Sequence, residues 1–176
     1  PQLIARGEYV VVLDPKRDNW MPHVFFSACQ QAAAPYHFVD LNQSAPAQLN
    51  PFLNCDAETL ENMLIGCFSL TEKGEAADFY RLNVRRCAAW LAQNPGATAR
   101  DAVAKFGDVW ADEAKAFLEY VREMAELNSV CAGGGLDIAD GAKRGGLLYV
   151  VGDMINPRIL RTQRMILLRL LFLAKQ

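Results

Sequence analysis

Phosphate chemistry is suggested first by a short charged segment, Asp14-Pro15-Lys16-Arg17-Asp18. It follows an unbroken apolar run, residues 10–13, that is typical of a strand covered on both faces. A carboxylate at the carboxyl end of such a strand lies where open α/β sheets bind ligands. Asp14 and Lys16 are therefore candidate nucleotide-proximal residues, with the Lys16 amine available for phosphate. The alternative is that Asp14 binds nearby backbone amides and that the charges after it are solvated.

A second candidate set is the basic strip near the carboxyl end of the chain. Arg158, Arg161 and Arg164 are three residues apart, so on a helix they form one slanted strip over about two turns. Guanidinium groups suit phosphate oxygens or the carboxylates of a neighbour. The alternative is a solvated or salt-bridged rim on a buried helix. A smaller basic cluster is better explained as a solvated face: Arg81, Arg85 and Arg86.

Other common sites find no support in the sequence. The glycines at 133–135 and 145–146 are not followed by Lys-Ser or Lys-Thr, so they indicate a mobile connector and not a phosphate-binding loop. His23 and His37 have no nearby nucleophile and are expected to be structural. No metal site is expected, because no C-x-x-C pair occurs. The cysteines are expected to be reduced and mostly buried: Cys29, Cys55, Cys67, Cys87 and Cys131.

The elements that must position these residues begin with a βαβ unit. The pattern predicts a strand at 8–14, a helix at 21–34 and a strand at 36–41, followed by a proline-rich loop. Residues 57–127 then carry four amphipathic helix patterns, with Thr98 as an N-cap and the last helix at 111–127.

A third strand is predicted at 147–151, and Pro157 begins a final helix that reaches Lys175. The second half of this helix is apolar almost all round and is expected to be buried. The whole order predicts an α/β fold with an all-helical insertion. Its expected parts are 1–54, the first part of the α/β domain, then 55–132, the insert, and 133–176, the return to the α/β domain.

Composition narrows the class of protein. Hydrophobic residues make up 52% and charged residues 22%, which is typical of a folded globular chain. The net charge of −2 gives no general reason to expect nucleic-acid binding. No apolar run reaches the roughly 20 residues of a membrane helix, so the chain is expected to be soluble. Both ends fall close to structural elements, and we expect an excised region of a longer protein.

With these elements in order, the chain resembles the coupling proteins of bacterial conjugation and type IV secretion, of the TraD/TraG type. These are RecA-like hexameric ATPases related to the FtsK and HerA translocases. The run Val10 to Lys16 is similar to the family's strand ending in Asp-Pro-Lys-Gly, although Arg17 replaces the usual glycine. Asn50-Pro51-Phe52 is similar to its Asn-Pro-hydrophobic element, and the helical block lies where the family inserts its all-α domain.

The resemblance implies a role for several residues and partners. Arg161 matches best the arginine that reaches a neighbouring subunit's nucleotide, with Arg164 in reserve, and such an arginine stabilises charge on the transferring phosphoryl group. The parent protein would use ATP and Mg²⁺, form a homo-hexamer and be the cytosolic part of an inner-membrane-associated protein. Its partners would be relaxase or relaxosome proteins, DNA and a type IV secretion channel. The phosphate loop would precede Pro1 and a second acidic strand would follow Gln176, so this chain alone is not expected to hydrolyse ATP or to need a cofactor.

Two other interpretations stay open at this point. One is a stand-alone helical protein-interaction module on a small α/β base, with no motor activity. The other is a complete small α/β enzyme, although no base and nucleophile stand at suitable spacing. The sequence of the parent gene distinguishes them, because a Gly-rich phosphate loop upstream would support the motor.

Overall fold

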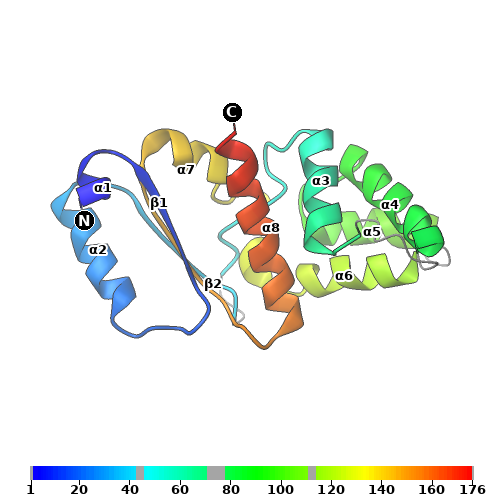
Figure 1. The fold of residues 1–176 in the computed structure, drawn as a ribbon, viewed down its shortest axis with the longest axis horizontal. Helices are drawn as coiled ribbons and strands as arrows, with labels where there is room; N and C mark the ends of the chain where they lie inside the picture. The colour runs from blue at the N-terminus through cyan, green and yellow to red at the C-terminus, as the bar shows by residue number, and fades with distance from the viewer. Residues whose placement is uncertain (1, 43–45, 71–77, 111–113, 176) are drawn as a thin grey trace.

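A computed structural model of the chain describes residues 2–42, 46–70, 78–110 and 114–175. Figure 1 shows the strands with α1 and α2 on one side of the molecule and helices α3 to α6 on the other. The elements follow in the order α1 (Gln2–Ala5), β1 (Tyr9–Asp14), α2 (Met21–Gln31), β2 (Tyr36–Asp40), α3 (Ala57–Cys67), α4 (Asp78–Gln93), α5 (Ala99–Trp110), α6 (Lys115–Ala125), the 3-10 helix η1 (Asn128–Val130), α7 (Ile138–Arg144), β3 (Gly146–Val151) and α8 (Pro157–Leu173).

The strands form one open sheet in the order β1-β3-β2, and both neighbouring pairs are parallel. This confirms the predicted α/β class with a parallel sheet. The central strand β3 is buried along its whole length. Its position between two partners explains why its sequence is apolar without alternation.

Each face of β3 packs against a different layer. Tyr149 lies in a small core with Cys29 of α2. Leu148 and Val150 instead belong to a large core that continues into the helical region. Successive side chains of a strand point to opposite faces, so α2 covers one face and the helices that follow β2 and β3 cover the other.

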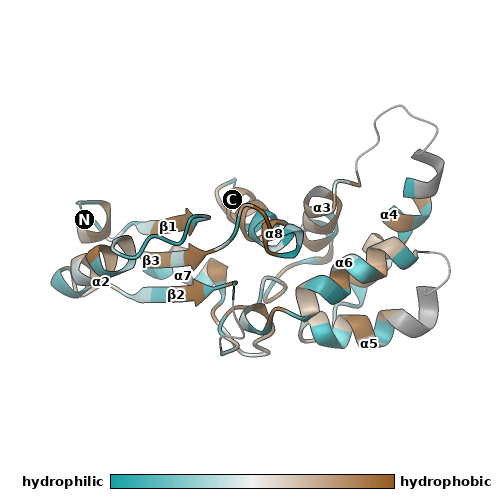
Figure 2. Cartoon of the chain, turned by 90° about the horizontal axis from the view of Figure 1, so that it is seen from below, coloured by the Kyte–Doolittle hydropathy of each residue, from teal (hydrophilic) through white to brown (hydrophobic). Residues whose placement is uncertain are grey.

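Helix α8 joins the sheet to the helical region. It contacts α3, α6 and α7, and its buried residues Ile159, Met165 and Ile166 lie in the same core as Leu148 of β3. Figures 1 and 2 show α8 between the strands and the helices α3 to α6. The insert therefore reaches the sheet largely through α8.

Helix starts are set by local sequence. The Asp56 carboxylate accepts from the Thr59 amide at 2.8 Å at the start of α3. The predicted cap of α5 is confirmed, because the Thr98 hydroxyl accepts from the Asp101 amide at 3.3 Å and donates to its carboxylate at 2.9 Å. These side chains satisfy amides that a helix leaves unpaired at its first turn. The predicted helix at 111–127 corresponds to α6, and residues 111–113 lie outside the described part.

The segment between the two glycine clusters is not the mobile connector that the sequence predicted. It contains α7, in which Ile138 and Gly141 are buried. Gly145 and Gly146 have φ values of 73° and 101°, and a Cβ on Gly146 would lie 2.5 Å from the Pro35 carbonyl oxygen. These glycines allow the chain to pass close to other backbone at the amino ends of the strands. A helix of only 7 residues is too short to show a clear hydrophobic period.

The second half of α8 differs from the prediction of general burial. Leu167 and Leu171 are 43% and 51% exposed, whereas Arg169 is 3% exposed. The reason is that one face of α8 packs on the core and on the loop before α3, and the leucines lie on the other face. Within the described residues, no helix is both long enough and apolar enough to cross a lipid bilayer.

Candidate functional site

The carboxyl ends of the strands place several polar side chains at one edge of the sheet. Asp14 at the end of β1 and Asp40 at the end of β2 are both in register with Val151, the last residue of β3. All strands run the same way, so their carboxyl ends meet at this edge. Ligands of open α/β sheets bind outside such an edge.

Asp14 organises the turn that follows β1. One carboxylate oxygen accepts from the amides of Lys16 and Arg17, both at 3.0 Å. The other accepts from the Asp18 amide at 2.7 Å and from the Tyr149 hydroxyl at 2.7 Å. Burial alone would raise the pKa of Asp14, but the hydrogen bonds from Tyr149 and the backbone amides outweigh it and lower the pKa. The carboxylate is thus ionised and saturated by donors of its own chain.

The side chains of Lys16 and Arg17 lie in different environments. The Lys16 side chain is exposed, and no ion pair to it occurs among the described residues. The Arg17 guanidinium crosses the edge of the sheet and pairs with Asp40. Arg17 has a φ of 59°, in the left-handed region that favours glycine. The turn therefore keeps a glycine-like backbone at the position where arginine replaces the usual glycine of the resembled family.

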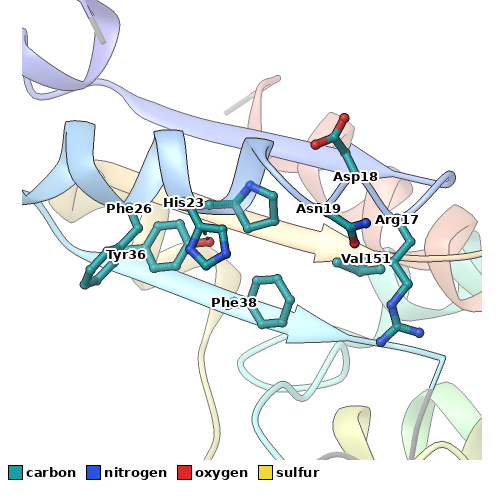
Figure 3. Close-up of a pocket in the computed structure, with 9 residues that line it drawn as sticks. Arg17, Asp18, Asn19, His23, Phe26, Tyr36, Phe38 and Val151 are labelled. Atoms are coloured by element: carbon teal, nitrogen blue, oxygen red, sulfur yellow. Dashed lines mark hydrogen bonds between the residues drawn. The ribbon is translucent and has the colours of Figure 1, made fainter.

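An aromatic pocket of about 360 Å³ opens beside this turn, between α2 and the edge strand β2. Figure 3 shows the Tyr36, Phe38 and His23 rings along it, with Arg17 and Asp18 at one end. The Phe26 and Tyr36 rings meet edge-on at 5.4 Å. The pocket is lined by Arg17, Asp18, Asn19, Pro22, His23, Phe26, Tyr36, Phe38 and Val151. A flat apolar group would fit between these rings. At the charged end of the pocket, Arg17 is already paired with Asp40 and Asp18 adds a second carboxylate.

Reasoning from the sequence missed this pocket. The available signal was the strand sequence Tyr-His-Phe-Val-Asp, in which Tyr36 and Phe38 stand two apart and so share one face. His23, expected to be structural, is an exposed member of the pocket lining. Burial lowers the pKa of His37, with a further contribution from the Arg144 charge, so His37 is held as a neutral ring.

The candidate arginines of α8 lie against the helical insert. The Arg161 guanidinium pairs with Glu123 of α6 and lies 4.3 Å from the centre of the Tyr120 ring. The Arg164 guanidinium donates to the Ser69 hydroxyl at 2.9 Å. Among the described residues, no hydrogen bond or ion pair joins either arginine to Asp14 or Lys16. The structure therefore places the four predicted site residues in two separate groups, and their roles stay predictions.

Basic residues of α8 also hold the insert in place. Arg158 pairs with Glu126, the C-cap residue of α6, at 2.7 Å. Arg169 is buried and donates to the Asn54 carbonyl oxygen at 2.9 Å and to the Cys55 sulfur at 3.4 Å. Arg158 and Arg161 form the salt-bridged rim that was the alternative prediction.

The cysteines and possible metal ligands are the remaining reactive groups. Cys55 is partly buried. The buried thiols are those of Cys29, Cys67, Cys87 and Cys131. Burial raises the pKa of Cys29, Cys55 and Cys131, which keeps these thiols protonated. Across the residues that the structure describes, no group of at least three His, Cys, Asp or Glu side chains could hold a metal ion.

Comparison with known proteins finds similarity to a curated protein. No protein-family model matches the chain, and no solved structure matches it. Mobilization protein A of Escherichia coli is 33% identical over 166 residues, an alignment that covers 76% of this chain and 26% of that protein. The chain thus spans about a quarter of the length of this curated relative.

Proposed function

We propose that this chain is a region of a protein that acts in plasmid mobilization, the transfer of DNA between bacteria by conjugation. The observation that carries this proposal is the 33% identity to Mobilization protein A across 76% of the chain. The relationship includes most of the folded region, so it is more than a shared short motif.

Within that role, we propose that the sheet is part of a RecA-like motor domain of a coupling ATPase. Three features support this. The parallel strands bring Asp14 and Lys16 to the carboxyl edge, where nucleotides bind in such sheets. The Asp-Pro-Lys turn keeps a glycine-like backbone at Arg17. Helices α3 to α6 stand between β2 and β3 in the chain, as an all-helical insertion would.

In this proposal the longer protein binds ATP and Mg²⁺, assembles as a homo-hexamer at the inner membrane and passes relaxase-bound DNA to a type IV secretion channel. Lys16 lies near the nucleotide. Arg161 acts on the nucleotide of a neighbouring subunit, for which it must first leave Glu123 and Tyr120. An arginine supplied in this way accelerates phosphoryl transfer by about a thousandfold or more.

The test is a conjugation assay with the full-length gene. Donor cells that lack the gene should transfer the plasmid poorly, and the wild-type gene should restore transfer. Arg161→Ala should fail to restore it, whereas Arg158→Ala, which removes an arginine from the same helix, should restore it. If the deletion leaves transfer unchanged, the role in mobilization is wrong. If Arg161→Ala transfers as well as wild type, the proposed role of Arg161 is wrong, and the stand-alone interaction module becomes the better account.

A further inference from the structure

A second pocket, of about 300 Å³, lies where the insert meets α8. It is formed by the end of α3, by α6 and by the first two turns of α8, which Figure 1 shows side by side. Its lining combines aromatic and aliphatic side chains with two guanidinium groups and a hydroxyl: Cys67, Phe68, Ser69, Tyr120, Pro157, Leu160, Arg161 and Arg164. None of these groups belongs to the sheet edge described above.

The two guanidinium groups of this pocket have different partners. Arg161 pairs with Glu123. Arg164 donates to the Ser69 hydroxyl, and no carboxylate of the described residues pairs with it. Burial raises the pKa of the Cys67 thiol, while the charges of Arg164 and Arg161 oppose that rise. Cys67 therefore stays a neutral thiol, and no carboxylate of the described residues neutralises Arg164.

The apolar walls of the pocket are firmly held. Phe68 is 6% exposed and lies edge-on to the Phe117 ring at 5.5 Å, with the Tyr120 ring at 5.3 Å. Leu160 of α8 also lines the pocket and is 43% exposed. Ser69 has a φ of 57°, a conformation that residues other than glycine rarely adopt. An apolar wall beside a guanidinium that pairs with no described carboxylate suits a ligand with both an apolar and an anionic group.

We propose that this pocket binds an acidic peptide segment of a partner protein. A carboxylate of the peptide pairs with Arg164 beside Ser69, and a neighbouring apolar side chain packs between Phe68 and Leu160. Arginine binds carboxylates through paired donors in a plane, which gives orientation as well as attraction. This inference does not depend on the motor activity proposed above.

Charge complementarity favours a peptide over a nucleic-acid backbone. Glu119 and Glu123 of α6 and Glu126 at its C-cap are already paired with Arg122, Arg161 and Arg158. A DNA strand carries a charge on every phosphate and would need a row of cations without carboxylate partners. A short peptide needs to place only one or two carboxylates near Arg164.

The probe is a fluorescein-labelled peptide, Gly-Ser-Asp-Glu-Phe-Asp-Glu-Gly, titrated with the chain in a fluorescence anisotropy assay at low salt. The control peptide carries Asn and Gln in place of Asp and Glu. Arg164→Met removes the charge and keeps the length of the side chain. Arg158→Met is the matched control, because it removes an arginine of the same helix that does not line the pocket. Thermal melts of both variants check that they are folded.

We expect saturable binding of the acidic peptide, no binding of the control peptide, and about tenfold weaker binding to Arg164→Met, as the loss of one charge-assisted hydrogen bond implies. Arg158→Met should bind within about twofold of wild type. Equal losses in the two variants would mean general attraction to a basic surface and would overturn the proposal. So would absence of peptide binding, or Arg164-dependent binding of a single-stranded oligonucleotide instead.

Discussion

The carboxyl edge of the sheet and the interface between α8 and the insert both depend on polar contacts, but they are built differently. At the sheet edge, Asp14 takes three of its four hydrogen bonds from the next four residues of the chain. At the α8 interface, the partners are distant in sequence: Arg161 and Glu123 are 38 positions apart, and Arg169 and Asn54 are 115 positions apart. Local sequence thus determines the first arrangement, whereas the second exists only when the whole chain has folded.

Burial varies within these regions, and both contain a buried polar residue. Asp14 and Arg169 are almost inaccessible to solvent, while the side chains of Arg158 and Glu126 are 41% and 59% exposed. Buried polar contacts that lose one partner are costly, and exposed ion pairs contribute little. Variants of these residues should therefore rank by burial and not by the number of charges involved.

The largest effect is expected for Arg169→Ala. The substitution leaves a cavity against the core and removes the donor to the Asn54 carbonyl oxygen, so the free energy of unfolding should fall by about 3 kcal/mol. Arg169→Met fills most of the volume and should lose less. Urea denaturation followed by circular dichroism measures both. Two variants as stable as wild type would show that Arg169 is not an anchor of the insert.

Asp14→Asn should come next, with a loss of about 2 kcal/mol at neutral pH. The pKa of Asp14 is lowered in the folded chain. The carboxylate therefore stabilises the fold above the unfolded-state pKa, near 4, and this contribution is lost as pH falls through the folded-state value. The difference in unfolding free energy between wild type and variant should shrink below about pH 4. A difference that stays constant from pH 7 to pH 3 would contradict this account.

Arg161→Ala should cost about 1 kcal/mol, because the ion pair with Glu123 and the contact with Tyr120 are partly exposed. Glu123→Gln removes only the ion pair and should cost less. If the double variant loses at least as much unfolding free energy as the two single variants together, Arg161 and Glu123 are not coupled in solution. Urea denaturation of the single and double variants completes this cycle.

The smallest effect is expected for Arg158→Ala, at about 0.3 kcal/mol in low salt. The Arg158–Glu126 pair is exposed, so 1 M NaCl should remove the difference by screening. A loss as large as that of Arg169→Ala would contradict the proposed ranking by burial. Thermal melts at both salt concentrations provide the comparison.

The difference between contacts to neighbouring residues and contacts to distant residues also explains what the sequence could predict. The strands, α2 and the Thr98 cap were found to within a few residues, because each depends on neighbouring side chains. The alternative reading of Asp14, as an acceptor for nearby amides, has the same local origin. The order of the sheet, with β3 between β1 and β2, depends on contacts between distant segments, and the sequence pattern did not predict it.

The predicted burial of α8 was least accurate because it depends on contacts between distant segments. Arg169 is buried and Leu167 is exposed because distant elements cover one face of the helix only. The aromatic pocket at β2 was within reach, since Tyr36 and Phe38 share a face, but its other walls come from α2. Helix α7 was missed because it is short and flanked by glycines.

The central claim, that Arg161 acts between the subunits of a DNA-transfer motor, is tested most directly by mixing subunits of the full-length protein. One preparation carries Arg161→Ala, and the other carries a lysine-to-alanine change in the phosphate loop that the motor requires. Each alone should show little ATP hydrolysis stimulated by single-stranded DNA, and mixing them should restore part of the wild-type rate. If the wild-type protein hydrolyses no ATP, or if mixing restores nothing, the account of Arg161 as a residue acting in trans is contradicted.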